Sequence, residues 1–216
     1  MKKENSVKQL VLLAMLCAVS FLMVATIRIP VVLFLNYEPK DVVITIGGFL
    51  LGPMASLIVS LVVSLLEMFT ISTTGPIGAV MNMLSTCAFA CTAAMIYKRK
   101  HTLMGAVLGL LCGSVLMIGA MLLWNYLITP LYMTGTSREA VAAMLIPVFL
   151  PFNALKAGLN TAFTLALYKP LVGALRKTGL IPKSAAPSKN KLGAYIFAAI
   201  LLITCVLLLL VYRGIL

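Results

Sequence analysis

The segment Pro151-Phe-Asn-Ala-Leu-Lys-Ala-Gly-Leu-Asn160 carries three polar side chains within an otherwise apolar stretch. Asn153, Lys156 and Asn160 stand at positions i, i+3 and i+7, so they share one face of a helix. In a membrane, a central lysine raises the insertion free energy by about 2.5–3.5 kcal/mol. Two interpretations stay open: a lysine that snorkels to the interface beside amides that join helices, or a binding site for a small polar molecule.

Composition decides that this segment lies in a membrane. The 216 residues are 62% hydrophobic and only 10% charged, and the apolar runs are long, which predicts an all-α integral membrane protein. The alternating ten-residue segments of a membrane barrel are absent. A net charge of +12 could suggest nucleic acid, but the basic residues flank the apolar runs, as the positive-inside rule expects. We therefore expect no nucleic-acid partner.

Periodicity and breakers divide the chain into seven spans. Gly52-Pro53 is a strong helix breaker, so we predict two helices rather than one between residues 41 and 70. With two helices, twelve of the seventeen Lys and Arg residues fall on one side of the membrane and four on the other, which predicts a cytoplasmic N-terminus. The expected helices cover residues 7–28, 41–51, 54–70, 77–97, 103–128, 147–175 and 192–212.

The connections follow from this division. Residues 30–40 are expected to form a loop, and a short surface helix is expected to start at Ser137. The chain divides into a six-helix membrane domain (1–178), a basic cytoplasmic linker (179–191) and an additional transmembrane helix (192–216).

Polar residues of four helices are expected at a similar depth, near the outer side. Glu67, Asn82 and the pair Trp124-Asn125 join the polar face of residues 153–160, and the loop from Thr70 to Gly78 adds hydroxyl groups and glycine backbone. Shared depth favours one outward-facing pocket. Carboxamides offer both donors and acceptors, which suits a flat heterocycle with an imide-like edge. The expected aromatic walls are Phe34, Tyr37, Trp124, Tyr126 and Phe152.

Charge burial and missing motifs limit the chemistry. We expect Glu67 and Lys156 to form an ion pair, because an unpaired charge at that depth is costly. The single histidine, His101, stands in a basic cluster away from the polar face, and the sequence has no nucleophile–base pattern, metal-ligand set or phosphate loop. We expect no catalytic residue, metal or resident cofactor, and an energy source on another subunit.

Seven short motifs stand out along the chain: Asn36-Tyr-Glu-Pro-Lys-Asp41, Gly47-Gly-Phe-Leu-Leu-Gly-Pro53, Glu67-Met-Phe-Thr70, Met81-Asn-Met-Leu-Ser-Thr86, Leu122-Leu-Trp-Asn-Tyr126, Thr129-Pro-Leu-Tyr-Met133 and Leu150-Pro-Phe-Asn-Ala-Leu-Lys156. Together these motifs resemble one family, the riboflavin-specific S component of energy-coupling factor (ECF) transporters. The resemblance covers about residues 7–175. It implies a six-helix core in a prokaryotic cell membrane, capture of riboflavin at the outer face, and a lid formed by the loop between the first two helices.

The resemblance also implies residue roles. It places Asn125, Asn153 and Lys156 against the polar edge of the isoalloxazine ring. It implies ligand contacts from the first loop (Leu35, Asn36, Tyr37) and from the turn at Thr74 and Gly75. Glu67, Asn82, Trp124 and Asn160 are candidates from the polar-face argument alone.

Partners follow from the same resemblance. Ala14 and Ala18 match a small-residue docking motif for a transmembrane coupling subunit, and two ATPase subunits complete the complex. The span 192–212 exceeds the six-helix pattern, and we assign it packing or anchoring. Three alternatives stay open: the same architecture for another vitamin such as thiamine, a solitary secondary transporter, and a purely structural membrane protein.

Overall fold

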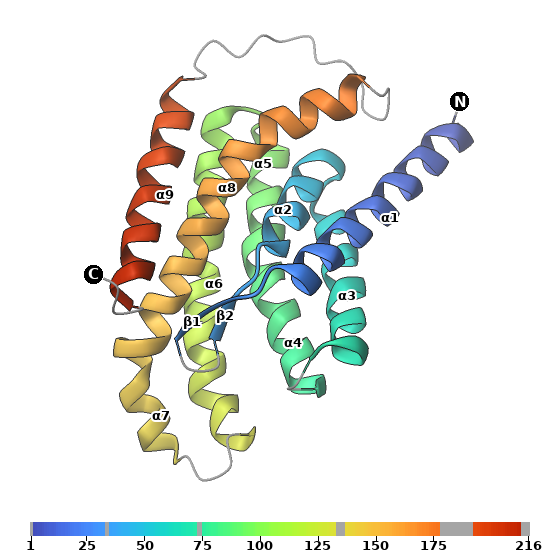
Figure 1. Cartoon of the computed structure of the whole chain (residues 1–216). Coiled ribbons are helices and arrows are strands. Elements are labelled where there is room, and N and C mark those ends of the chain that lie inside the picture. Colours follow the sequence, from blue (N-terminus) through green and yellow to red (C-terminus); the bar gives the residue numbers. More distant parts are fainter. Residues whose placement is uncertain (1, 33–34, 73–74, 133–136, 178–191, 213–216) are drawn as a thin grey trace.

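The computed structural model describes residues 2–32, 35–72, 75–132, 137–177 and 192–212 as a helical bundle with one β-hairpin (Figure 1). The all-α prediction is confirmed. Two π-helical segments interrupt long helices, at Cys87–Cys91 between α4 and α5 and at Leu145–Phe149 between α7 and α8. The helices are α1 (Lys2–Thr26), α2 (Lys40–Leu51), α3 (Pro53–Thr70), α4 (Gly75–Thr86), α5 (Thr92–Arg99), α6 (Leu103–Tyr132), α7 (Arg138–Met144), α8 (Leu150–Lys177) and α9 (Leu192–Tyr212).

The break between α2 and α3 lies where the sequence predicts it. Gly52 has a φ of 96°, which favours glycine, and Pro53 is the first residue of α3. The two-helix prediction is therefore confirmed. Residues 40–49 of α2 are all buried, so this short helix is a central element of the bundle and shows lipid little of its surface.

A β-hairpin stands where we expected an irregular loop. Strands β1 (Ile29–Val32) and β2 (Leu35–Tyr37) pair antiparallel, with Ile29 opposite Tyr37 and Pro30 opposite Asn36. The loop prediction was wrong because Pro30 was read only as a helix breaker, although β-branched residues surround it. Val31, Leu35 and Tyr37 are buried and pack in one hydrophobic cluster with Phe149 and Phe152, which anchors the hairpin beside α8.

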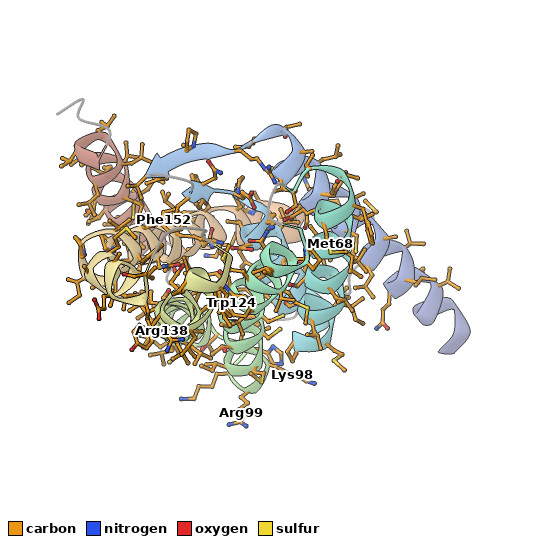
Figure 2. The ribbon with its side chains drawn as sticks, turned by 90° about the horizontal axis from the view of Figure 1, so that it is seen from below. Met68, Lys98, Arg99, Trp124, Arg138 and Phe152 are labelled. Atoms are coloured by element: carbon orange, nitrogen blue, oxygen red, sulfur yellow. The ribbon has the colours of Figure 1, made fainter. Side chains whose placement is uncertain are left out.

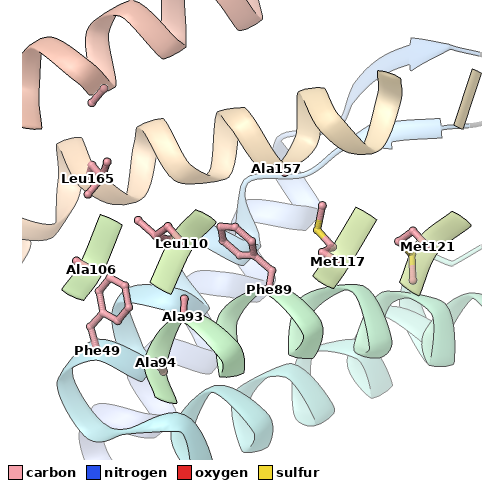
Figure 3. Packing of buried hydrophobic residues seen from close by; sticks show 11 residues of the cluster. Phe49, Phe89, Ala93, Ala94, Ala106, Leu110, Met117, Met121, Ala157 and Leu165 are labelled. Carbon is pink, nitrogen blue, oxygen red and sulfur yellow. The ribbon is translucent and has the colours of Figure 1, made fainter. Parts of the chain in front are cut away.

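Glycines on α6 let it approach the neighbouring helix closely. A Cβ built on Gly105, Gly109 or Gly113, at every fourth residue, would lie 2.0–2.7 Å from a backbone carbonyl oxygen of Lys100, Ala93 or Phe89. Such spacing of small residues is typical of tightly packed membrane helices. The adjoining core holds Phe89, Leu110 and Met117 (Figure 3).

The outer surface of the bundle matches a bilayer environment. Among the described residues, five helical spans are long and apolar enough to cross a membrane: 7–26, 53–70, 75–99, 103–131 and 138–171. A shorter apolar helix covers 195–211. Figure 1 shows the N-terminal end of α1, the α5–α6 junction and the C-terminal end of α8 at the same end of the molecule, so the basic flanks of these helices gather there.

Helix α9 packs along α8. A Cβ on Gly158 would lie 2.6 Å from the sulfur of Cys205, so the two helices approach at a glycine. The predicted linker at 179–191 lies outside the described residues.

Candidate ligand-binding site

A cavity lies at the end of the bundle opposite the basic flanks, between the hairpin and helices α3, α4, α6 and α8. Seen from that end, nitrogen and oxygen atoms gather between the hairpin and the helices (Figure 2). Its polar lining is Arg28, Asn36, Glu38, Glu67, Ser72, Asn82, Ser85, Asn125, Asn153 and Lys156. Its apolar lining is Leu35, Ile77, Gly78, Met81, Met121 and Phe152. The wall is thus polar on one part and apolar on another, as binding sites for amphipathic small molecules are.

Seven of the twelve candidate ligand residues line this cavity. They are Leu35, Asn36, Glu67, Asn82, Asn125, Asn153 and Lys156. Tyr37, Gly75, Trp124 and Asn160 do not line it, and Thr74 lies outside the described residues, as does Phe34. Of the expected aromatic walls, Phe152 alone among the described residues belongs to the lining.

Two carboxamides of the cavity, those of Asn125 and Asn153, each donate a hydrogen bond to a backbone carbonyl. Asn125 donates from Nδ2 to the carbonyl of Met121 at 2.7 Å and accepts at Oδ1 from the Thr129 hydroxyl at 2.9 Å. Asn153 donates to the carbonyl of Phe149 at 2.7 Å. The two bonds to backbone carbonyls each reach back four residues along the chain, so they hold the amide planes without help from a ligand.

Asn82 is oriented by an acid. Its Nδ2 donates to Oε2 of Glu67 at 2.8 Å, and Oε1 of the same carboxylate pairs with Lys40. The expected pair between Glu67 and Lys156 is therefore wrong. Sequence reasoning had assigned Lys40 to the exterior loop, whereas it is the first residue of α2 and only 1% exposed.

The ion pairs continue to the rim of the cavity. Glu38 lies 3.1 Å from Nζ of Lys40 and 3.2 Å from Nε of Arg28. Arg28 also donates from Nη1 to the carbonyl of Ile71, at 3.4 Å. This row connects the flank of the hairpin to the end of α3 across the entrance.

Asp41 is the partner of Lys156. Its Oδ2 lies 3.2 Å from Nζ of Lys156, and Asn160 donates to the same oxygen at 3.3 Å. Sequence reasoning missed Asp41 because it stands at the start of α2, far along the chain from residues 153–160. The small number of acidic residues could have pointed to Asp41. The chain has only five, and three of them, Glu38, Asp41 and Glu67, belong to this network.

Two candidates outside the lining support its walls. Tyr37, the last residue of β2, is buried, and burial, together with the negative charge of Asp41, raises the pKa of its phenol, so the ring is a neutral packing group. Trp124 packs against the core cluster of Figure 3. Trp124 is not among the residues that line the cavity, and its contact with a ligand stays a prediction.

The described residues contain no cluster of side chains that could hold a metal ion. In the described ranges, no three His, Cys, Asp or Glu side chains come together as a metal-ligand group. His101 lies beside Tyr97, with ring centroids 5.4 Å apart, at the end of α5. The cavity offers hydrogen bonds and apolar contacts to a ligand.

A partly polar cavity within a bundle of apolar helices is the arrangement that a membrane substrate-binding protein requires. Residues 8–168 match the model of the ECF transporter, substrate-specific component, and the chain belongs to this family. The family is a substrate-binding part of a transporter and not an enzyme.

Two curated relatives and one solved structure are similar to the chain. The riboflavin transporter RibU of Staphylococcus aureus (strain TCH60) is 28% identical over 79% of this chain and 93% of its own length. The riboflavin transporter FmnP of Bacillus subtilis (strain 168) is 28% identical over 69% of this chain and 84% of its own. The structure of the S component of a bacterial ECF transporter aligns with a TM-score of 0.63 and 27% identity, over 82% of this chain and 99% of that one.

The family match ends before α9. The family model stops at residue 168, and α9 begins at Leu192. The family match therefore does not extend to α9, and the packing or anchoring role assigned to residues 192–212 stays a prediction.

Proposed function

We propose that this chain captures riboflavin at the outer face of a prokaryotic cell membrane and passes it to an ATP-driven ECF transporter. The observation that carries the proposal is the cavity, in which Asn82, Asn125, Asn153 and Lys156 meet Phe152. A riboflavin ring has an imide edge with alternating acceptors and a donor, and a flat apolar body. Fixed amides and an ammonium group suit the edge, and the aromatic and methionine side chains suit the body. The two relatives named riboflavin transporters support this choice of ligand.

The hairpin is the element we expect to open and close. Leu35 and Asn36 of β2 line the cavity, so a ligand within it would touch the hairpin directly. Short strands anchored by a few side chains open at lower cost than packed helices do. The ligand contacts that we assigned to Thr74 and Gly75 stay a prediction.

The orientation that we propose puts the N-terminus in the cytoplasm. The bias of twelve basic residues against four supports this, and the cavity then opens to the outside. The chain is expected to dock through Ala14 and Ala18, which are exposed on α1, onto a transmembrane coupling subunit. Two ATPase subunits would supply the energy, since the sequence contains no phosphate loop.

The test is riboflavin binding to the purified full chain in detergent. Trp124 is the only tryptophan, and flavin absorption overlaps tryptophan emission, so energy transfer reports binding even though Trp124 is outside the lining. We expect saturable quenching, with a calorimetric titration as an independent check. Asn153→Ala should weaken binding by about 10-fold or more. Thr204→Ala, on the exposed side of α9, is the control that should retain wild-type affinity.

The remaining alternatives give different outcomes. Binding of thiamine with no response to riboflavin would keep the family and change the ligand. Riboflavin uptake into vesicles that lack ATPase subunits, driven by an ion gradient, would overturn the assignment to an ATP-driven complex.

A further inference from the structure

Asp41 is the most heavily engaged buried acid of the described bundle. It is fully buried at the second position of α2 and does not line the cavity. Its Oδ1 accepts from the Thr86 hydroxyl at 2.6 Å, and its Oδ2 accepts from Asn160 at 3.3 Å and lies 3.2 Å from Nζ of Lys156. Helices α4 and α8 thus fix both carboxylate oxygens.

Lys156 connects this carboxylate to the cavity. Its side chain lines the cavity and is 9% exposed. An ammonium group has three N–H donors. Asp41 and the Ser85 hydroxyl, at 3.4 Å, accept two of them, so one donor is left for an acceptor atom of a ligand.

A lysine that was not held by Asp41 and Ser85 would bind a ligand with lower affinity. Its four-carbon stem has many rotamers, and ordering it during binding would oppose affinity. An isolated ammonium at this depth would also lack charge compensation. Lys40 forms its ion pairs with Glu38 and Glu67, whereas the ion pair of Asp41 is with Lys156.

We propose that Asp41 is a positioning residue of the ligand site, which holds the ammonium of Lys156 so that its third donor meets a carbonyl oxygen of the ligand. The proposal rests on the riboflavin-binding function proposed above. Asp41 then affects riboflavin affinity only by holding the side chain of Lys156.

Asp41→Asn tests this, because the amide keeps the shape and removes the charge. Riboflavin titration of the full-length variant should show an affinity about 10- to 100-fold lower than wild type. Lys156→Met should show a similar loss. The double variant should be no weaker than Lys156→Met alone, since the energies of residues that act through one another do not add. Additive losses would overturn the proposal.

A spectroscopic measurement separates positioning from general damage. Loss of the ammonium contact should shift the infrared carbonyl bands of bound riboflavin in the same direction in Asp41→Asn and Lys156→Met. A matched control is Gly109→Ala, which disturbs the α5–α6 contact away from this network and should leave both affinity and bands unchanged. Wild-type carbonyl bands in Asp41→Asn would contradict the proposal.

A second variant covers the case in which Asp41→Asn does not fold. Thr86→Val removes the donor to Oδ1 without leaving an unpaired charge. It should weaken riboflavin binding about threefold in the wild-type background and not at all in the Lys156→Met background. An equal loss in both backgrounds would refute the positioning role.

The two proposals fail in different ways. If the wild-type chain does not bind riboflavin, the proposed function fails. If the wild-type chain binds riboflavin and Asp41→Asn binds it equally well, only the positioning role of Asp41 fails.

Discussion

Lys40 forms an ion pair with Glu67, 27 residues further along the chain, and the two side chains are only 1% and 2% exposed. The pair joins the first turn of α2 to the last turns of α3, next to the cavity. Two helices that meet at Gly52-Pro53 are therefore joined again at their far ends.

Removing one member of this pair should destabilise the protein strongly. Glu67→Ala leaves the buried Lys40 with Glu38 as its remaining ion-pair partner, and breaking a buried pair costs about 3–5 kcal/mol. Thermal unfolding of the purified protein in detergent would measure the loss.

The control for that measurement is Glu139→Ala on α7. Glu139 is exposed, so its removal should change the unfolding free energy by less than about 1 kcal/mol. Equal melting temperatures for the Glu67 variant and wild type would show that the buried pair contributes nothing to stability.

The glycine contact between α6 and α5 predicts a steric effect. Gly109→Ala puts a Cβ 2.7 Å from the carbonyl oxygen of Ala93, and overpacking of this kind costs about 1–3 kcal/mol. Gly119→Ala on the same helix meets no atom within 4 Å, so it should be neutral or stabilising by up to about 1 kcal/mol. Similar unfolding curves for both variants would argue against a tight contact.

Arg28 should affect how long a ligand stays bound. Its contacts with Glu38 and with the Ile71 carbonyl cross the cavity entrance, but its side chain is 35% exposed, and such pairs are weak. Arg28→Ala should raise the riboflavin dissociation rate about two- to fivefold, as measured by stopped-flow fluorescence. The control is Arg138→Ala, an arginine that stacks over Tyr126 on the outside of the bundle. A dissociation rate equal to wild type would exclude a role for Arg28 at the entrance.

If α1 is the docking helix, substitutions on its exposed face should impair assembly with the coupling subunit but not riboflavin binding. Ala14→Leu and Ala18→Leu add bulk to an exposed face of α1, so they should prevent co-purification with the coupling subunit and leave riboflavin affinity unchanged. Val19→Leu, at a neighbouring exposed position, should allow normal assembly. Normal co-purification of both alanine variants would rule out this face as the docking site.

Local signals were sufficient for much of the architecture. Long apolar runs predict helices because a lipid-exposed backbone must satisfy its own hydrogen bonds, and Gly52-Pro53 predicts a break because neither residue supports a continuous helix there. The hairpin was missed although Ile29, Val31 and Val32 favour strand, because strands of four and three residues carry too few side chains for a clear alternation.

For the site, the sequence by itself determined which residues needed a polar environment: Asn153, Lys156 and Asn160 repeat on one helical face, and their burial in lipid without partners is too costly. Only the tertiary structure decided the partners. Lys156 pairs with Asp41 rather than Glu67, Glu67 pairs with Lys40, and Asn160 contacts Asp41 instead of the cavity. Helical periodicity specifies the face a side chain occupies, whereas its partner depends on the rotation and depth of separate helices, and these are set by packing contacts such as the α6 glycines.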